Sequence, residues 1–236
     1  MEIMSQNKKA RIAGLLYLLL IISGFTYLVY IPSELIDLKN ATKTIENIRN
    51  SEFLFRLGIV TAICSSLIFM LLPLALYNLL KSVNNVSAKF MVLFALISIP
   101  ISFVNILNKF SVLTLINKSE YAEKFGQTEL QTQVMLYLEN YNNGVQLSQI
   151  LWGLWLLPFG YLVYKSGFLP KILGIFLMAG CFGYLITFFG GFLNSDFNKT
   201  IISDIIGFPE PIGEIGICLW LLIMGTNKLN FRKKLQ

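Results

Sequence analysis

Six long apolar stretches, separated by polar connections, dominate this sequence. They cover residues 12–31, 57–80, 90–107, 144–164, 172–193 and 211–226. A helix needs about 20 mostly apolar residues to cross the hydrocarbon core of a bilayer, and each stretch reaches or approaches that length. Hydrophobic residues make up 55% of the chain and charged residues only 14%, a composition typical of a protein embedded in a lipid bilayer. The sequence therefore predicts an all-α, polytopic membrane protein, with six transmembrane helices in a single domain over residues 1–236 and the lipid bilayer as a partner.

Basic residues are distributed unevenly around the six stretches. One set lies at the two ends of the chain and in the short turns: Lys8, Lys9, Arg11, Lys81, Lys89, Lys165, Lys171, Lys228, Arg232, Lys233 and Lys234. Glu2 is the only acid in those regions, whereas the long connections 32–56, 108–143 and 194–211 hold all other acids except Glu214. Because cytoplasmic loops are enriched in Lys and Arg, both termini are predicted to be cytoplasmic. This topology explains the net charge of +6 without a nucleic-acid partner.

The long extracytoplasmic connections contain helical patterns of their own. Residues 40–56 read as an amphipathic helix, with Ile45, Ile48 and Phe53 on one side and charges on the other. From Thr128, apolar residues at helical spacing predict a helix that runs without a break into the fourth span. We therefore expect helical loops that partly cover the outer end of the bundle.

Glu214 is the one carboxylate inside a predicted span, and it has two interpretations. Pro211 suits a first helical position, and a carboxylate one turn later interacts favourably with the positive end of the helix dipole. Ionisable residues inside a membrane are nevertheless candidates for a functional site. Arg56 is the expected cationic partner of Glu214, although Arg56 could instead pair with Glu52 at i,i+4 spacing on its own helix.

Depth in the membrane brings further polar residues to a level similar to that of Glu214. Counting about 1.5 Å per helical residue from the cytoplasmic lysines puts Glu214, Gln149, Asn105 and Tyr184 roughly 20 to 24 Å up, in the outer third of the core. Arg56 lies at the outer boundary. These side chains either line a pocket that opens outward or hydrogen-bond between helices as packing contacts. Trp152 is either an aromatic wall for a ligand or a packing residue. The candidate ligand-binding residues are Glu214, Arg56, Gln149, Asn105, Tyr184 and Trp152.

The sequence lacks the residues that most known catalytic sites require. The chain contains no histidine, which excludes a Ser-His-Asp triad and His-ligated metal or haem. Cys64, Cys181 and Cys218 all lie in predicted spans, where small apolar packing residues are expected rather than a disulfide framework. We therefore predict no catalytic residues, no metal and no cofactor, and we favour a non-enzymatic protein.

Several stretches resemble a family of bacterial multi-pass membrane proteins. They are "ARIAGLLYLLLIISG", "SEFLFRLGI", "LPLALYNLLK", "GLWLLPFGYLVYKSGFLPKILGI" and "GEIGICLWLL". Together they are similar to the domain of unknown function 4386 family, from about Ala10 to Gly225. The resemblance implies a bacterial protein of the inner (cytoplasmic) membrane, and it supplies no ligand or catalytic residue.

The residues leave three functional hypotheses open. The first is a non-enzymatic membrane protein that binds, and in one version transports, a small or lipidic ligand in an outer-facing polar pocket. The second is a structural or partner-binding protein that takes no ligand. The third is an intramembrane enzyme that uses Glu214 as an acid or base.

Overall fold

The computed structural model describes residues 5–194 and 196–226, and these residues form helices without any strand. Glu2 and the basic residues Lys228, Arg232, Lys233 and Lys234, used above to orient the chain, lie outside the described residues. The helical segments are α1 (Gln6–Phe25), η1 (Thr26–Tyr30), α2 (Ile31–Leu35), α3 (Ala41–Asn50), α4 (Glu52–Leu80), α5 (Asn85–Asn117), α6 (Ser119–Ser166), α7 (Lys171–Leu193), η2 (Phe197–Lys199), α8 (Ile201–Gly207), α9 (Pro209–Leu219) and η3 (Trp220–Met224). The predicted all-α class is confirmed.

Six helical stretches of the described chain are long and apolar enough to cross a membrane. They are Gln6–Leu35, Glu52–Leu80, Asn85–Asn117, Gly126–Ser166, Lys171–Leu193 and Ile201–Met224. Each contains or overlaps one predicted span, so the six-span prediction is confirmed, while several helices extend beyond the apolar run. These helices extend because backbone hydrogen bonding continues past the end of the hydrophobic segment until a helix-breaking residue is reached.

The chain folds as two compact units, each made of separate pieces of the sequence. Unit 1 comprises three pieces, residues 1–19, 68–99 and 147–236, and unit 2 comprises two pieces, residues 20–67 and 100–146. Helices α1, α4, α5 and α6 each contribute residues to both units. The prediction of a single domain is not tested by this division and stays a prediction.

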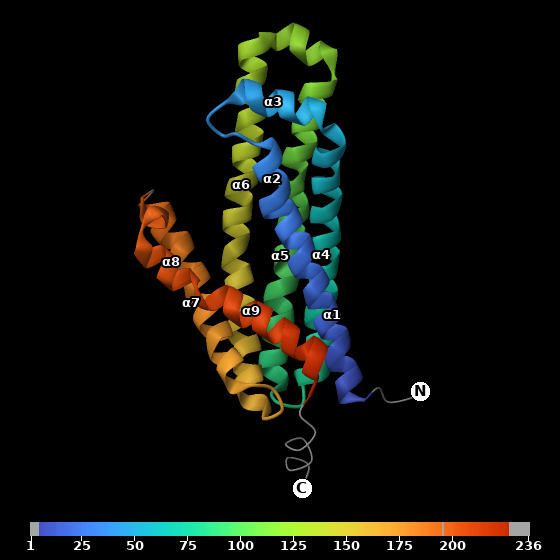
Figure 1. Ribbon diagram of the computed structural model, residues 1–236, viewed down its shortest axis with the longest axis vertical. Coiled ribbons are helices and arrows are strands. Elements are labelled where there is room, and N and C mark those ends of the chain that lie inside the picture. Colours follow the sequence, from blue (N-terminus) through green and yellow to red (C-terminus); the bar gives the residue numbers. More distant parts are fainter. Residues whose placement is uncertain (1–4, 195, 227–236) are drawn as a thin grey trace. The chain divides into compact units, whose positions relative to one another are not determined.

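Unit 2 is organised around a hydrophobic core that includes Ile48 of α3, Phe55 of α4, Val112 of α5 and Val134 of α6. Helix α3 lies across the long helices of this unit (Figure 1) and is capped at its start by Asn40, whose side chain accepts from the Lys43 N–H at 3.0 Å. Such an N-cap satisfies one of the amide donors that a helix start leaves free.

The predicted amphipathic helix over 40–56 is only partly correct. Ile45 and Ile48 are buried as expected, but Ser51 has a non-helical backbone and separates α3 from α4. Phe53 falls on the far side of that break and is 80% exposed. The prediction for Phe53 was therefore wrong, because a change of helix axis resets which residues share a face.

The predicted continuous helix from Thr128 into the fourth span is confirmed. Gly126 has a positive φ of 70° and breaks α6 there, after which the helix runs without interruption to Ser166. Leu130, Val134 and Leu138 are buried against the core of unit 2. A glycine reaches this backbone conformation at little cost, whereas other residues rarely do.

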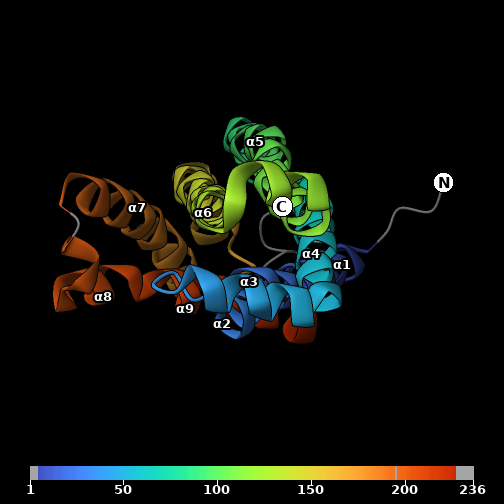
Figure 2. The same ribbon diagram turned by 90° about the horizontal axis from the view of Figure 1, so that it is seen from above.

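Unit 1 is held together by closely packed helices. A Cβ at Gly160 of α6 would lie 2.6 Å from the carbonyl oxygen of Gly174 on α7, so the two backbones touch where neither residue has a side chain. Helix α7 also lies side by side with α8 (Figures 1 and 2), where Gly183 meets the carbonyl of Ile206. Small residues allow such close approach in membranes, where helix association depends on van der Waals packing.

The first and last spans meet within unit 1. The backbone N–H of Thr226 donates to the Asn7 side chain at 2.9 Å, and the Thr226 hydroxyl donates to the same oxygen. The beginning of the first span and the end of the last span therefore lie next to each other. That both lie on the cytoplasmic side of the membrane stays a prediction.

Adding a methyl group at the α6–α7 contact should destabilise the protein. We expect Gly160→Ala to lower the free energy of unfolding by about 1 to 3 kcal/mol, the range typical of overpacking. Gly24→Ala is the matched control, because a Cβ at this helical position meets nothing within 4 Å and alanine favours helix. Thermal unfolding of both variants in the same detergent provides the measurement, and equal midpoints would contradict the contact.

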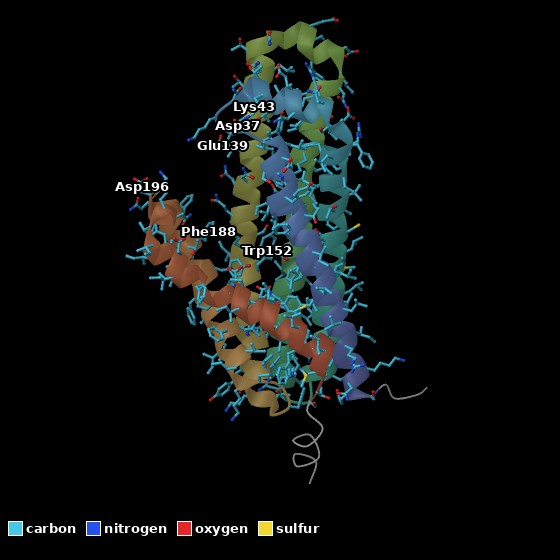
Figure 3. All side chains as sticks on the ribbon, in the orientation of Figure 1. Asp37, Lys43, Glu139, Trp152, Phe188 and Asp196 are labelled. Carbon is cyan, nitrogen blue, oxygen red and sulfur yellow. The ribbon has the colours of Figure 1, made fainter. Side chains whose placement is uncertain are left out.

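Asp37, between α2 and α3, gives a second prediction. The backbone N–H of Lys39 and then the Lys43 ammonium hold the pKa of Asp37 below its ordinary value, and Figure 3 shows Asp37 beside Lys43. A carboxylate with a lowered pKa in the folded state adds stability that is lost as pH falls below about 4. Asp37→Asn should therefore lower the unfolding midpoint slightly at pH 7 and not at pH 3. A difference that persists at pH 3 would contradict this assignment.

Candidate functional site

Glu214 accepts a hydrogen bond from a buried phenol. The hydroxyl of Tyr17, on α1, donates to Oε2 of Glu214 at 2.9 Å, and both residues belong to unit 1. Tyr17 is completely buried, whereas Glu214 is half-buried. The carboxylate is thus held from a helix nearly two hundred residues away in sequence, and one of its oxygens has a defined position.

Glu214 is not at the start of its helix. Helix α9 begins at Pro209, so Glu210 occupies the first turn and Glu214 the second. Phe208, which links α8 to α9, also has helical backbone angles. The helix-start explanation built on Pro211 therefore fails, because the helix dipole acts mainly within the first turn.

Aromatic rings surround the Tyr17 side of this contact. Trp155 and Phe159 of α6 stack at 5.3 Å between ring centroids, with an interplanar angle of 11°. The Tyr17 ring lies 6.1 Å from that of Trp155 and 6.3 Å from that of Phe159. Phe69 of α4 packs edge-on against Trp155 at 5.2 Å. We call Tyr17, Phe69, Trp155 and Phe159 the aromatic cluster; its interlocked rings fix the direction of the Tyr17 hydroxyl.

A second carboxyl–phenol pair lies one turn earlier on the same helix. Glu210 is within hydrogen-bonding reach of the Tyr184 hydroxyl, and it faces Glu214 at i,i+4 spacing on α9. Tyr184 comes from α7 and packs on Gly153 of α6, where a Cβ would lie 2.7 Å from the Cβ of Tyr184. We call Glu210, Glu214, Tyr17 and Tyr184 the carboxyl–phenol cluster.

The two carboxylates of this cluster have no cationic side chain among the described residues. The ion pairs found there join Lys43 to Asp37, Arg56 to Glu52 and Lys199 to Asp196. Two carboxyl groups four residues apart repel each other when both are charged. In a membrane span, an unpaired carboxylate also costs several kcal/mol, on the order quoted for charges in the bilayer. The cluster can therefore hold a proton or a bound cation between its oxygens.

The other predicted polar residues divide between the two units. Arg56 pairs with Glu52 through Nη2 at 2.6 Å, and Asn117 donates to the same carboxylate at 3.0 Å. Asn105 donates to the backbone carbonyl of Tyr141 at 2.9 Å. Arg56 and Asn105 both belong to unit 2 and have their partners there, so the structure uses the Glu52 alternative for Arg56. The single pocket lined by all six candidates stays a prediction.

Gln149 and Trp152, on α6, belong to unit 1 with Glu214 and Tyr184. Gln149 is half-buried and forms no hydrogen bond with another described residue. Trp152, which is labelled in Figure 3, is also half-buried. The tryptophan that packs against Tyr17 is Trp155, one turn later on the same helix, and a role of Trp152 as an aromatic wall for a ligand stays a prediction.

The contact with Tyr17 also revises the depth of Glu214. Tyr17 lies about 14 Å along α1 from Lys8, at about 1.5 Å per residue, which is near the middle of a core about 30 Å thick. The sequence-based depth was counted from Lys228, outside the described residues. Counted from Lys8, the carboxyl–phenol cluster is expected nearer the middle of the core than when it is counted from Lys228, and the depth of Glu214 stays a prediction.

Three charged or phenolic residues with notable contacts in the structure were not among the candidates predicted from the sequence. Tyr17 lies in an apolar run, and nothing local indicates that its hydroxyl meets a carboxylate. Glu210 could have been found from its i,i+4 spacing to Glu214 in "PEPIGE". Lys109 was assigned to a connection, but it is a buried residue within α5. Among the described residues, no group of three or more His, Cys, Asp or Glu side chains could hold a metal ion.

Comparison with protein families matches the resemblance seen in the sequence. The model of the family described as "Domain of unknown function (DUF4386)" matches residues 12–225. The chain belongs to this family. Searches of the curated proteins and of the solved structures found no match. This DUF4386 protein is thus a multi-pass membrane protein by its six apolar helices, and its function has to be inferred from its own residues.

The Tyr17–Glu214 contact makes a direct prediction. Tyr17→Phe removes the hydroxyl that donates to Glu214 and should lower the free energy of unfolding by about 1 to 3 kcal/mol, the cost of leaving a buried acceptor unsatisfied. Tyr161→Phe is the matched control, because Tyr161 is 36% exposed. Chemical unfolding in mixed micelles measures the difference. Equal losses in the two variants would show that the Tyr17 hydroxyl contributes nothing specific.

Proposed function

We propose that this DUF4386 protein binds a small cationic ligand within the membrane at the carboxyl–phenol cluster of unit 1. The observation that carries the proposal is the placement of two carboxyl groups, Glu214 and Glu210, one turn apart on α9, where no cationic side chain of the described residues would balance their ionised forms. A monovalent organic cation or a protonated amine would supply that balance. Gln149 and Trp152, from the same unit, are proposed as further contacts of the ligand.

The aromatic cluster supports a cation in particular. The faces of Trp, Tyr and Phe rings attract cations, with about 2 kcal/mol or more per contact when water is excluded. Trp155 and Phe159 pack against Tyr17, whose hydroxyl donates to the Glu214 carboxylate. A cation with an apolar surface would enter from lipid and would meet negative charge and aromatic rings together. Pockets near Leu74 and near Arg11 in the same unit contain neither Glu210 nor Glu214, so the proposal rests on charge rather than on a preformed volume.

Two other interpretations compete with ligand binding. As a packing contact, the Tyr17–Glu214 bond would only hold α1 to α9, and Glu214→Gln would lower thermal stability without affecting any ligand. As an acid or base in an intramembrane enzyme, Glu214 would first have to bind a substrate. The same binding experiment therefore distinguishes ligand binding from a role in packing alone. It also has to come before any test of catalysis or transport.

The test uses the full chain in lipid nanodiscs and tetraphenylphosphonium, a lipophilic monovalent cation, as the probe. We expect the protein to bind the probe and Glu214→Gln to weaken binding about tenfold or more, which corresponds to about 1.4 kcal/mol. Glu139→Gln is the matched control, because Glu139 is an exposed carboxylate on α6 (Figure 3). Equal binding by the wild type, Glu214→Gln and Glu139→Gln would refute the proposal.

A further inference from the structure

Lys109 is buried on the core face of α5 in unit 2. Its residual exposure is 2%, which is rare for a lysine. Asn105, Ile106, Val112 and Leu113 are buried on the same helix, at spacings of three and four residues from Lys109, so these residues share one face with it. The lysine therefore belongs to the packed interior of the unit rather than to a lipid-facing or water-facing surface.

The Lys109 ammonium lies over an aromatic ring. Its Nζ is 4.1 Å from the centroid of the Tyr141 ring on α6. Asn105, one turn before Lys109, donates to the Tyr141 carbonyl at 2.9 Å and so holds the two helices together at this level. Tyr27 of η1 lies near Tyr141, and its hydroxyl is within hydrogen-bonding reach of Ser65 on α4. Helix α6 thus contacts the lysine directly, and η1 lies next to the same Tyr141.

No described acid neutralises this cation. Lys109 forms no ion pair and no hydrogen bond with a described residue; its contact is with the Tyr141 ring. Glu52, in the same unit, is engaged by Arg56 and Asn117. Glu139 lies on α6 close to Tyr141 in sequence but is exposed. The unit therefore encloses a positive charge without a matching negative one.

A bound anion would offset the free-energy cost of burying the Lys109 ammonium. Burying an ammonium group without a partner carries a large desolvation cost even after relaxation of its surroundings, and a cation–π contact offsets only part of that cost. A charge-assisted hydrogen bond to a carboxylate or phosphate oxygen would supply the difference. Because the lining is apolar and aromatic, an anion that carries a hydrocarbon chain fits it better than a hydrated inorganic ion.

We propose that Lys109 and Tyr141 form a second site, in unit 2, for the monoanionic head group of an amphiphile, either a carboxylate or a phosphate. The ammonium pairs with the head-group oxygen, and the Tyr141 ring holds the ammonium in place. The site takes the opposite charge to the carboxyl–phenol cluster and does not depend on the function proposed for that cluster.

The experiment compares three probes of equal chain length on the full chain in phosphatidylcholine nanodiscs. Decanoate and decyl phosphate carry the anionic group, and decanol is their neutral counterpart. We expect at least one anionic probe to raise the thermal unfolding midpoint of the wild type above that reached with decanol. Equal midpoints with all three probes would overturn the proposal, and this comparison needs no variant.

Variants then assign the effect to Lys109. Lys109→Gln should weaken the apparent affinity for the anionic probe about tenfold or more, the loss expected for one charge-assisted bond. Lys109→Arg should retain most of it, and Lys118→Gln, at an exposed lysine next to the end of α5, should leave it unchanged. An undiminished response in Lys109→Gln would overturn the assignment.

The source of the anion is distinguished by changing the lipid. If phosphatidylglycerol nanodiscs stabilise the wild type over phosphatidylcholine nanodiscs without any added probe, and Lys109→Gln abolishes that difference, a membrane lipid occupies the site. If only decanoate or decyl phosphate acts, the occupant is a free amphiphile. Both outcomes support the site.

Discussion

The cost of a bare charge in hydrocarbon is the constraint on which the rest of this structure depends. Helices satisfy their own backbone groups, so six apolar helices cross a membrane without further help. Charged side chains inside those helices need partners. Arg56 and Glu52 solve this on one turn of α4, whereas Glu214 depends on a phenol from α1 and Lys109 on a ring of α6.

Those different solutions separate structural from functional candidates. In the Arg56–Glu52 pair, the positive and negative charges balance, and Asn117 donates a further hydrogen bond to the carboxylate. No ligand is needed to account for such a pair. Glu214 and Glu210 are held by phenols that share a proton but bring no positive charge. Lys109 has an aromatic face and no carboxylate. Among the described residues, ionisable groups without an ion-pair partner thus occur in both units, acidic in unit 1 and basic in unit 2, and they mark the places where ligands are proposed.

Much of the fold could be read from the sequence, and the errors have identifiable causes. The six spans and the long helix from Gly126 follow from hydrophobic length and periodicity, which act locally. Phe53 was misplaced because Ser51 ends one helix and lets the next begin in a new direction. Glu214 was assigned to a helix start because Pro211 is a good first residue, although Pro209 is the one that begins α9.

The sequence by itself determined that this protein is a helical membrane protein with an ionisable group in its last span, since a bilayer selects long apolar helices whatever their arrangement. Only the tertiary structure decided what that group touches. The partner of Glu214 is Tyr17, and the neighbour of Lys109 is Tyr141, because packing brings helices together that are distant in sequence. No local pattern encodes such pairs: a buried tyrosine in an apolar run looks the same with or without a carboxylate opposite its hydroxyl.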